Sequence, residues 1–207
     1  MTHVLYYRVL AGDAGAEEEL EALATEAQLK DDVAAWTAGL ISLAEIDLSA
    51  GRAEQARDRL VTALRHPALE DRDRHLAKLA RAYAALGETA RASETAEDSV
   101  NALRQKRDPE HLGRALSARG TVRAAERRWV EAQADFEEAL TMMREGRRVW
   151  DEANALADYG LMLKAKGQVN DAEDKLREAL ELFDRMGAKP SSDRTRQVLE
   201  DLGTPKP

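Results

Sequence analysis

Apolar residues return at helical spacing along nearly the whole chain. Leu176, Ala179, Leu180 and Phe183, for example, follow the i, i+3, i+4, i+7 pattern that places side chains on one face of a helix. No stretch alternates apolar and polar residues with the β-branched enrichment typical of strands. The pattern therefore predicts an all-α protein.

The helical pattern is interrupted at regular intervals by short turns. We place these turns at Gly15, Gly51, Gly87, Arg127 and Gly167, which are separated by 36, 36, 40 and 40 residues. Residues that are small in all units but the first recur at fixed distances after each turn. The two series are Leu20, Ala56, Ala92, Ala132 and Ala172, and Ala27, Ala63, Ser99, Ala139 and Ala179. Because small side chains let neighbouring helices cross closely, the period indicates stacked helix pairs.

Two helices per unit, a tight turn and a small residue at each crossing resemble the tetratricopeptide repeat (TPR). The last unit carries the resemblance best, with Leu156, Tyr159-Gly160, Gly167, Ala172 and Leu176 in their expected places. The resemblance implies a right-handed superhelical solenoid of helix-turn-helix pairs. The spacing exceeds the usual TPR period of about 34 residues, and Arg127 stands where a turn glycine is typical.

The repeat register divides one solenoid domain, residues 1–207, into units. We expect an irregular first pair over 1–30, repeats over 31–67, 68–107, 109–145 and 148–187, and a capping helix over 191–203. Asp31-Asp32 and Asp108-Pro109-Glu110 supply helix-start signals at the openings of two repeats. Ser191-Ser192-Asp193 is expected to cap the final helix, which would cover the last repeat as a lid.

Composition narrows the class of function. The chain has 43% apolar residues, 34% charged residues and no cysteine, which excludes disulfides and thiolate metal sites. A net charge of −8 argues against nucleic acid as a partner. No apolar run is long enough to span a membrane, and no signal peptide is visible, so we expect a cytoplasmic protein that does not engage membranes.

The sequence contains no motif of a catalytic, cofactor or metal site. His3, His66, His75 and His111 form no pair at metal-ligand spacing, and neither a phosphate-binding loop nor a serine-nucleophile motif is present. Acidic runs such as Glu17-Glu18-Glu19 open helices, where the helix dipole favours them. We therefore expect a protein that is not an enzyme and has no cofactor; a hydrolase or transferase would need a buried acid or histidine in a closed pocket.

The TPR resemblance also implies which residues face the concave groove, because the leading helix of each pair lines it. The candidate partner-binding residues are Arg74, Arg81, Arg114, Ser117, Thr121, Asn154, Leu161 and Lys164. Arginine can hold a carboxylate with two hydrogen bonds, so the three arginines are candidate anchors for a protein or peptide, including an acidic one. The competing interpretation is that they pair with neighbouring acids or face water.

The region from Trp150 to Gly203 resembles the final repeats of large bacterial signalling ATPases and transcriptional regulators. The hypothesis is a non-catalytic interaction scaffold or adaptor that binds a peptide or protein in its groove, with a place in bacterial signalling implied by this resemblance. Two alternatives stay open. The chain could be the sensor segment of a larger regulator, or it could form a homodimer through the apolar N-terminal residues Val4, Leu5, Tyr6, Tyr7, Val9 and Leu10.

Overall fold

The computed structural model describes residues 2–203, apart from the side chains of residues 2, 3, 14 and 203. This part of the chain forms eleven α-helices and no strand. The helices are α1 (Thr2–Leu10), α2 (Ala14–Leu29), α3 (Val33–Ser49), α4 (Ala53–Arg65), α5 (Asp73–Ala85), α6 (Thr89–Lys106), α7 (Pro109–Ala125), α8 (Trp129–Glu145), α9 (Val149–Lys166), α10 (Val169–Met186) and α11 (Lys189–Gly203). The prediction of an all-α solenoid is confirmed.

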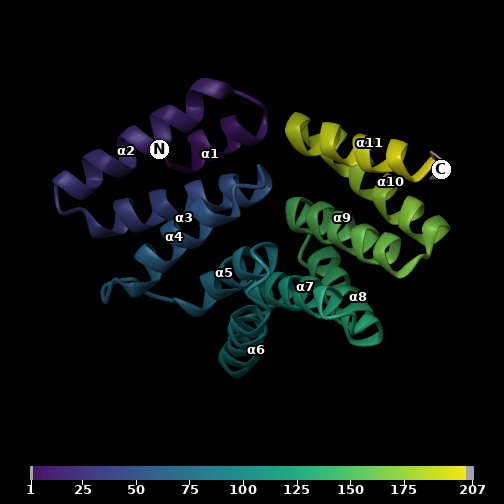
Figure 1. Ribbon diagram of the computed structural model, residues 1–207. Helices are drawn as coiled ribbons and strands as arrows, with labels where there is room; N and C mark the ends of the chain where they lie inside the picture. The colour runs from purple at the N-terminus through teal and green to yellow at the C-terminus, as the bar shows by residue number, and fades with distance from the viewer. Residues whose placement is uncertain (1, 204–207) are drawn as a thin grey trace.

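The helices stack as antiparallel pairs in two layers. The odd-numbered helices, here called the inner helices, contact one another in sequence from α1 to α9, and each even-numbered helix packs behind its own pair and against the next. Figure 1 shows the array curving so that α1 in purple and α11 in yellow lie near each other, and these two helices are in contact. The array therefore closes on itself around its inner face.

Side chains cap several helices where the sequence predicts it. The carboxylates of Asp32 and Asp108 accept hydrogen bonds from the backbone N–H groups of Ala35 (3.0 Å) and His111 (3.2 Å). Pro109 occupies the first turn of α7, where it removes an N–H that would have no partner. These two caps fix where the inner helices α3 and α7 begin.

The turns between paired helices use the left-handed backbone region. Gly51, Gly87 and Gly167 have φ values of 77°, 73° and 88°, and Arg127 takes the equivalent place with φ 59°. A side chain in this region costs about 1 kcal/mol relative to glycine. Arg127 therefore keeps the turn geometry at a cost in stability.

The first turn lies earlier than predicted. Gly15 belongs to α2, and the turn is made by Gly12, whose φ is 93°. Asp13 caps α2 by accepting a hydrogen bond from the Gly15 N–H, so the helix has already begun at Gly15. With this correction Ala16 and Leu20 occupy the buried positions that Ala56 and Leu60 occupy in α4.

The final helix also begins earlier than predicted, at Lys189 rather than at 191. Ser191 and Ser192 do not cap it; both are buried within its first turns, and their N–H groups donate to the carbonyl of Ala188. Pro190 favours this early start because its fixed φ is compatible with a first helical turn. The helix packs on α10 and additionally reaches α1.

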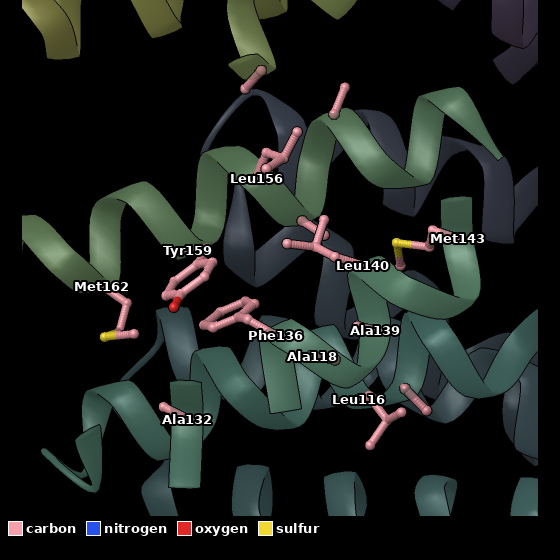
Figure 2. Packing of buried hydrophobic residues seen from close by; sticks show 14 of the residues in the cluster. Leu116, Ala118, Ala132, Phe136, Ala139, Leu140, Met143, Leu156, Tyr159 and Met162 are labelled. Carbon is pink, nitrogen blue, oxygen red and sulfur yellow. The ribbon is translucent and has the colours of Figure 1, made fainter. Parts of the chain in front are cut away.

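Small residues bring the helices of a pair close together, and aromatic side chains fill the space between pairs. A Cβ atom added at Gly160 would lie 2.7 Å from Leu176 Cγ, so α9 and α10 cross there in near-contact. Figure 2 shows Phe136 and Tyr159 stacked between α8 and α9, with ring centroids 5.2 Å apart. The largest hydrophobic cluster extends from α5 to the start of α11, and smaller clusters join the earlier pairs.

Candidate functional site: the central cavity

The inner helices enclose a cavity of about 320 Å³, here called the central cavity. All six inner helices contribute side chains to its wall, including Tyr6 from α1, Glu45 from α3 and Arg194 from α11. The cavity exists because the array curves until its two ends meet. It is thus a property of the whole chain rather than of one repeat.

Most of the predicted groove residues meet in this cavity. Arg74, Arg81, Arg114, Ser117, Asn154 and Leu161 line it. Thr121 and Lys164 lie one or two turns further along α7 and α9 and are not part of the lining. The Thr121 hydroxyl instead donates to the carbonyl of Ser117. A role of these residues in binding stays a prediction.

Each of the three predicted arginines already holds a carboxylate. Arg74 Nε lies 3.0 Å from Asp108 Oδ2, and Arg114 Nε lies 2.9 Å from Asp151 Oδ1. Arg81 Nη2 lies 3.0 Å from Asp158 Oδ2. The hydrogen bonds from Nε orient the guanidinium groups of Arg74 and Arg114, whereas Arg81 contacts Asp158 as an ion pair without a hydrogen bond.

Several lining residues were not among the predicted site residues. Lys78 lies on α5 one helical turn after Arg74, and its Nζ is 3.5 Å from Glu45 Oε2. Asp151 and Asp158 flank Asn154 on the same face of α9, a spacing that could have revealed them. Tyr6 and Arg194 come from α1 and α11, which join the wall only through closure of the array. No local sequence pattern indicates that α1 and α11 come into contact.

The charge of the wall differs in sign from that of the chain. Five cationic side chains line the cavity, namely Arg74, Lys78, Arg81, Arg114 and Arg194, against the three carboxylates of Glu45, Asp151 and Asp158. The chain as a whole has a net charge of −8. The cavity is therefore a locally electropositive site within an acidic protein, which favours anionic groups on a ligand.

Burial and ion pairing shift the titration of the carboxylates in the wall. Burial raises the pKa of Asp158 above its ordinary range, although Arg81 and Arg194 act in the opposite direction. Burial also pushes the pKa of Glu45 upward, but Lys78, Tyr6 and Arg114 outweigh it and hold that pKa below the ordinary value. For Tyr6, burial and then Glu45 raise the pKa of the phenol, which stays protonated.

The N-terminal apolar residues divide between the core and the surface. Leu5, Tyr6 and Leu10 are buried against α2 and α3. Val4 and Tyr7 are exposed. The homodimer stays a prediction, and the surface of α1 available for it is centred on Val4 and Tyr7 rather than on Leu5.

Among the side chains that the structure describes, which do not include that of His3, no set of three or more histidine or acidic groups is arranged to bind a metal ion. None of the helices within residues 2–203 combines the length and apolar character needed to cross a lipid bilayer.

Neither a family model nor a curated protein matches the sequence. Solved structures do match the fold. A Rap protein complexed with competence and sporulation factor is 14% identical with a TM-score of 0.72, over 93% of this chain and 54% of that protein. The chain thus spans about half the length of that Rap protein.

Two further structures have the same kind of fold. BtubC (BKLC) from P. vanneervenii is 16% identical with a TM-score of 0.54, over 98% of this chain and 94% of that chain. A repeat protein from Podosopora anserina, described as a kinesin light chain with nearly identical TPR-like repeats, is 20% identical with a TM-score of 0.55, over 87% of this chain and 92% of that chain. These similarities show a TPR-like fold.

Proposed function

We propose that this chain, a repeat protein of the TPR-like fold, binds a short peptide or the end of a protein chain in its central cavity. The observation that carries the proposal is the wall itself, which draws side chains from all six inner helices and holds more cations than carboxylates. A concave site that combines apolar surface with a few fixed polar groups is typical of ligand-binding pockets.

The lining suits a peptide because it alternates apolar and hydrogen-bonding surface. Leu10, Leu48, Leu161 and Val198 supply apolar contact, and the amide of Asn154 lies among them. The Asn154 side chain donates one hydrogen bond to the carbonyl of Trp150 at 2.7 Å, which fixes its orientation and leaves the amide oxygen as an acceptor. The similar Rap protein was crystallised with competence and sporulation factor, which supports a ligand-binding role for an array of this shape.

We infer a non-catalytic role. The three carboxylates of the wall are held by cations, as in the Arg81–Asp158 and Arg114–Asp151 pairs, and none is placed as a base beside a nucleophile. A place in bacterial signalling, a cytoplasmic location and a role as the sensor segment of a larger regulator stay predictions. The match covers 54% of the Rap protein, and this supports the sensor segment as an alternative.

The proposal is tested by filling the cavity without changing its charge. Leu161→Trp and Ala157→Trp place an indole on the cavity wall, whereas Val130→Trp adds the same group to an exposed site on α8. Immobilised wild-type protein is incubated with a pool of short random peptides, and retained peptides are identified by mass spectrometry. We expect both cavity variants to lose retention and the Val130 variant to keep it. Equal retention by all four proteins would overturn the proposal.

Self-assembly is tested separately at the exposed part of α1. Val4→Glu combined with Tyr7→Glu removes its apolar surface without touching buried Leu5. If the wild-type chain is a homodimer through this end, light scattering should show half the mass for the double variant. An unchanged mass would remove this alternative.

A further inference from the structure

Arg194 on α11 differs from the other cations of the central cavity. Arg74, Lys78, Arg81 and Arg114 each lie within 4 Å of a carboxylate. Arg194 has no carboxylate within that distance among the described residues, and its one hydrogen bond, from Nη2 to Ser191 Oγ, is long at 3.4 Å. The cavity thus contains one guanidinium group whose charge is not matched by a direct partner.

The surroundings of Arg194 do not supply the missing anion. The nearest acidic influence is Asp158, but that carboxylate is already held by Arg81 at 3.0 Å. Burial lowers the pKa of Arg194, and Arg81 adds to the effect while Asp158 opposes it. Two guanidinium groups therefore face one carboxylate, and the Arg194 side chain is exposed, so this end of the cavity keeps a positive charge that a ligand can reach.

Apolar side chains lie next to this charge. Val198 is one helical turn after Arg194 on α11, and Leu161 is one turn after Asp158 on α9; both line the cavity. Leu161 is 45% exposed, so it offers contact area that no described residue covers. A ligand could place a carboxylate at Arg194 and its adjacent carbon atoms against these two residues.

We propose that Arg194 binds a carboxylate of the peptide that occupies the central cavity, with Val198 and Leu161 contacting the neighbouring apolar part of that peptide. The inference rests on the proposed function and names the chemical group that the site selects. The carboxylate has two sources with the same chemistry, the C-terminus of the peptide and the side chain of an aspartate or glutamate.

The test uses four pools of short random peptides and the full chain. The peptides end either in a free carboxylate or in an amide, and each type is made with and without aspartate and glutamate. We expect the wild-type protein to retain peptides that carry a carboxylate over amidated peptides without acidic residues. Dependence on the free end assigns the terminal carboxylate, and dependence on aspartate or glutamate assigns a side chain.

Arg194→Gln should weaken the binding of a retained carboxylate peptide about tenfold or more, as for loss of a charge-assisted hydrogen bond. Arg194→Lys should restore part of the affinity, since it keeps the charge but not the two-pronged geometry. Arg196→Gln is the matched control, because Arg196 lies on the same helix and pairs with Asp184 and Asp193 instead. Circular dichroism and thermal unfolding establish that all three variants fold.

The outcomes separate this inference from the proposed function. If all four pools are retained equally and Arg194→Gln binds as well as the wild-type protein, the cavity binds peptides but Arg194 does not select a carboxylate. If the wild-type protein retains peptides from no pool, both proposals are overturned. Equal losses in the Arg194 and Arg196 variants would also overturn the inference, because the effect would then be one of net charge.

Discussion

Two arginines outside the cavity lining, Arg119 and Arg123, hold neighbouring helices together. Arg119 and Asp135 are buried, and their side chains make two hydrogen bonds of 3.0 and 2.7 Å. Arg123 and Glu97 complete the group, so α6, α7 and α8 are joined by one ionic cluster. A buried charge is tolerated only when partners such as these satisfy it.

Removal of Arg119 should therefore be costly. We expect Arg119→Ala to lower the free energy of unfolding by about 3 kcal/mol, the low end for breaking a buried pair, because Arg123 still contacts Asp135. Arg104→Ala is the control, since Arg104 pairs with Glu138 on the surface and should contribute less than about 1 kcal/mol. Urea denaturation of both variants measures the difference, and equal losses would contradict this account.

Burial of His75 makes the stability of the folded chain depend on pH. Burial lowers its pKa to about 4, with Lys78, His111 and Arg114 adding to the effect and Glu45 opposing it. The imidazole is therefore neutral in the folded chain and takes up a proton more readily after unfolding. Its contribution to stability is fully present above the ordinary pKa of 6.5 and is lost as the pH falls toward 4.

We expect the wild-type free energy of unfolding to fall between these two pH values more steeply than that of His75→Gln. Denaturant titrations at several pH values across this window measure both slopes. His66 lies in the link after α4, so His66→Gln is a suitable control. If the free energy of unfolding of the wild-type protein and of His75→Gln changes equally with pH, protonation of the imidazole does not destabilise the folded chain.

The sequence predicts which residues line the cavity better than it predicts their ion-pair partners. Six of the eight predicted groove residues line the cavity, because their helical spacing determines which face they occupy. Their ion-pair partners were not predicted. Arg74–Asp108 and Arg114–Asp151 are separated by 34 and 37 residues, close to one repeat. A search for opposite charges one repeat apart would have found them, whereas local spacing could not.

At the scale of elements, close helix crossing determines which positions tolerate a side chain. The helix types and most turns follow from periodicity, but the first turn was misplaced at Gly15 because a glycine there fitted the period. The two glycines are physically different. Gly160 lies where α10 leaves no room for a methyl group, and Gly15 lies at the exposed start of α2, with only Asp13 Oδ1 nearby at 3.7 Å.

The same substitution should therefore have opposite effects at these two sites. Gly160→Ala would bring a methyl group within 2.7 Å of Leu176 Cγ and 3.2 Å of the Ala172 carbonyl, and we expect a loss of about 1–3 kcal/mol from overpacking. Gly15→Ala should instead raise stability by up to about 1 kcal/mol, because alanine loses less backbone freedom in a helix. Thermal and urea unfolding of both variants measure the signs; a stabilising Gly160→Ala would contradict the packing described here.

At the scale of the whole molecule, the chain departs from a simple linear array. In an open solenoid each repeat contacts only its neighbours, so the two ends are energetically independent. Here α1 contacts α11, and the cavity depends on that contact. The sequence could not show this closure, because the curvature sums small rotations at every pair and no residue pattern records the total.

Trp150 on α9 is the side chain that joins the two ends most directly. It packs against the hydrophobic cluster that contains Leu5 and Leu10 of α1. It also packs against the largest cluster, where its ring centroid lies 5.6 Å from that of Phe183. A large-to-small change at a fully buried tryptophan costs about 3–5 kcal/mol, and Trp150, which is partly buried, should cost less. Because the array is closed, the substitution should also destabilise α1, which is distant from Trp150 in the sequence.

We therefore expect Trp150→Ala to speed amide hydrogen exchange in α1 and α11 as well as in α9. Trp129 on α8 is the matched control, because it packs against the largest cluster but not against the cluster that contains Leu5 and Leu10. Trp129→Ala should leave exchange in α1 unchanged, since local opening spreads through packed neighbours. If both variants confine faster exchange to their own and adjacent helices, the two ends behave independently in solution. The central cavity would then be an open groove rather than an enclosed site, and ligands would reach it from the side of α1.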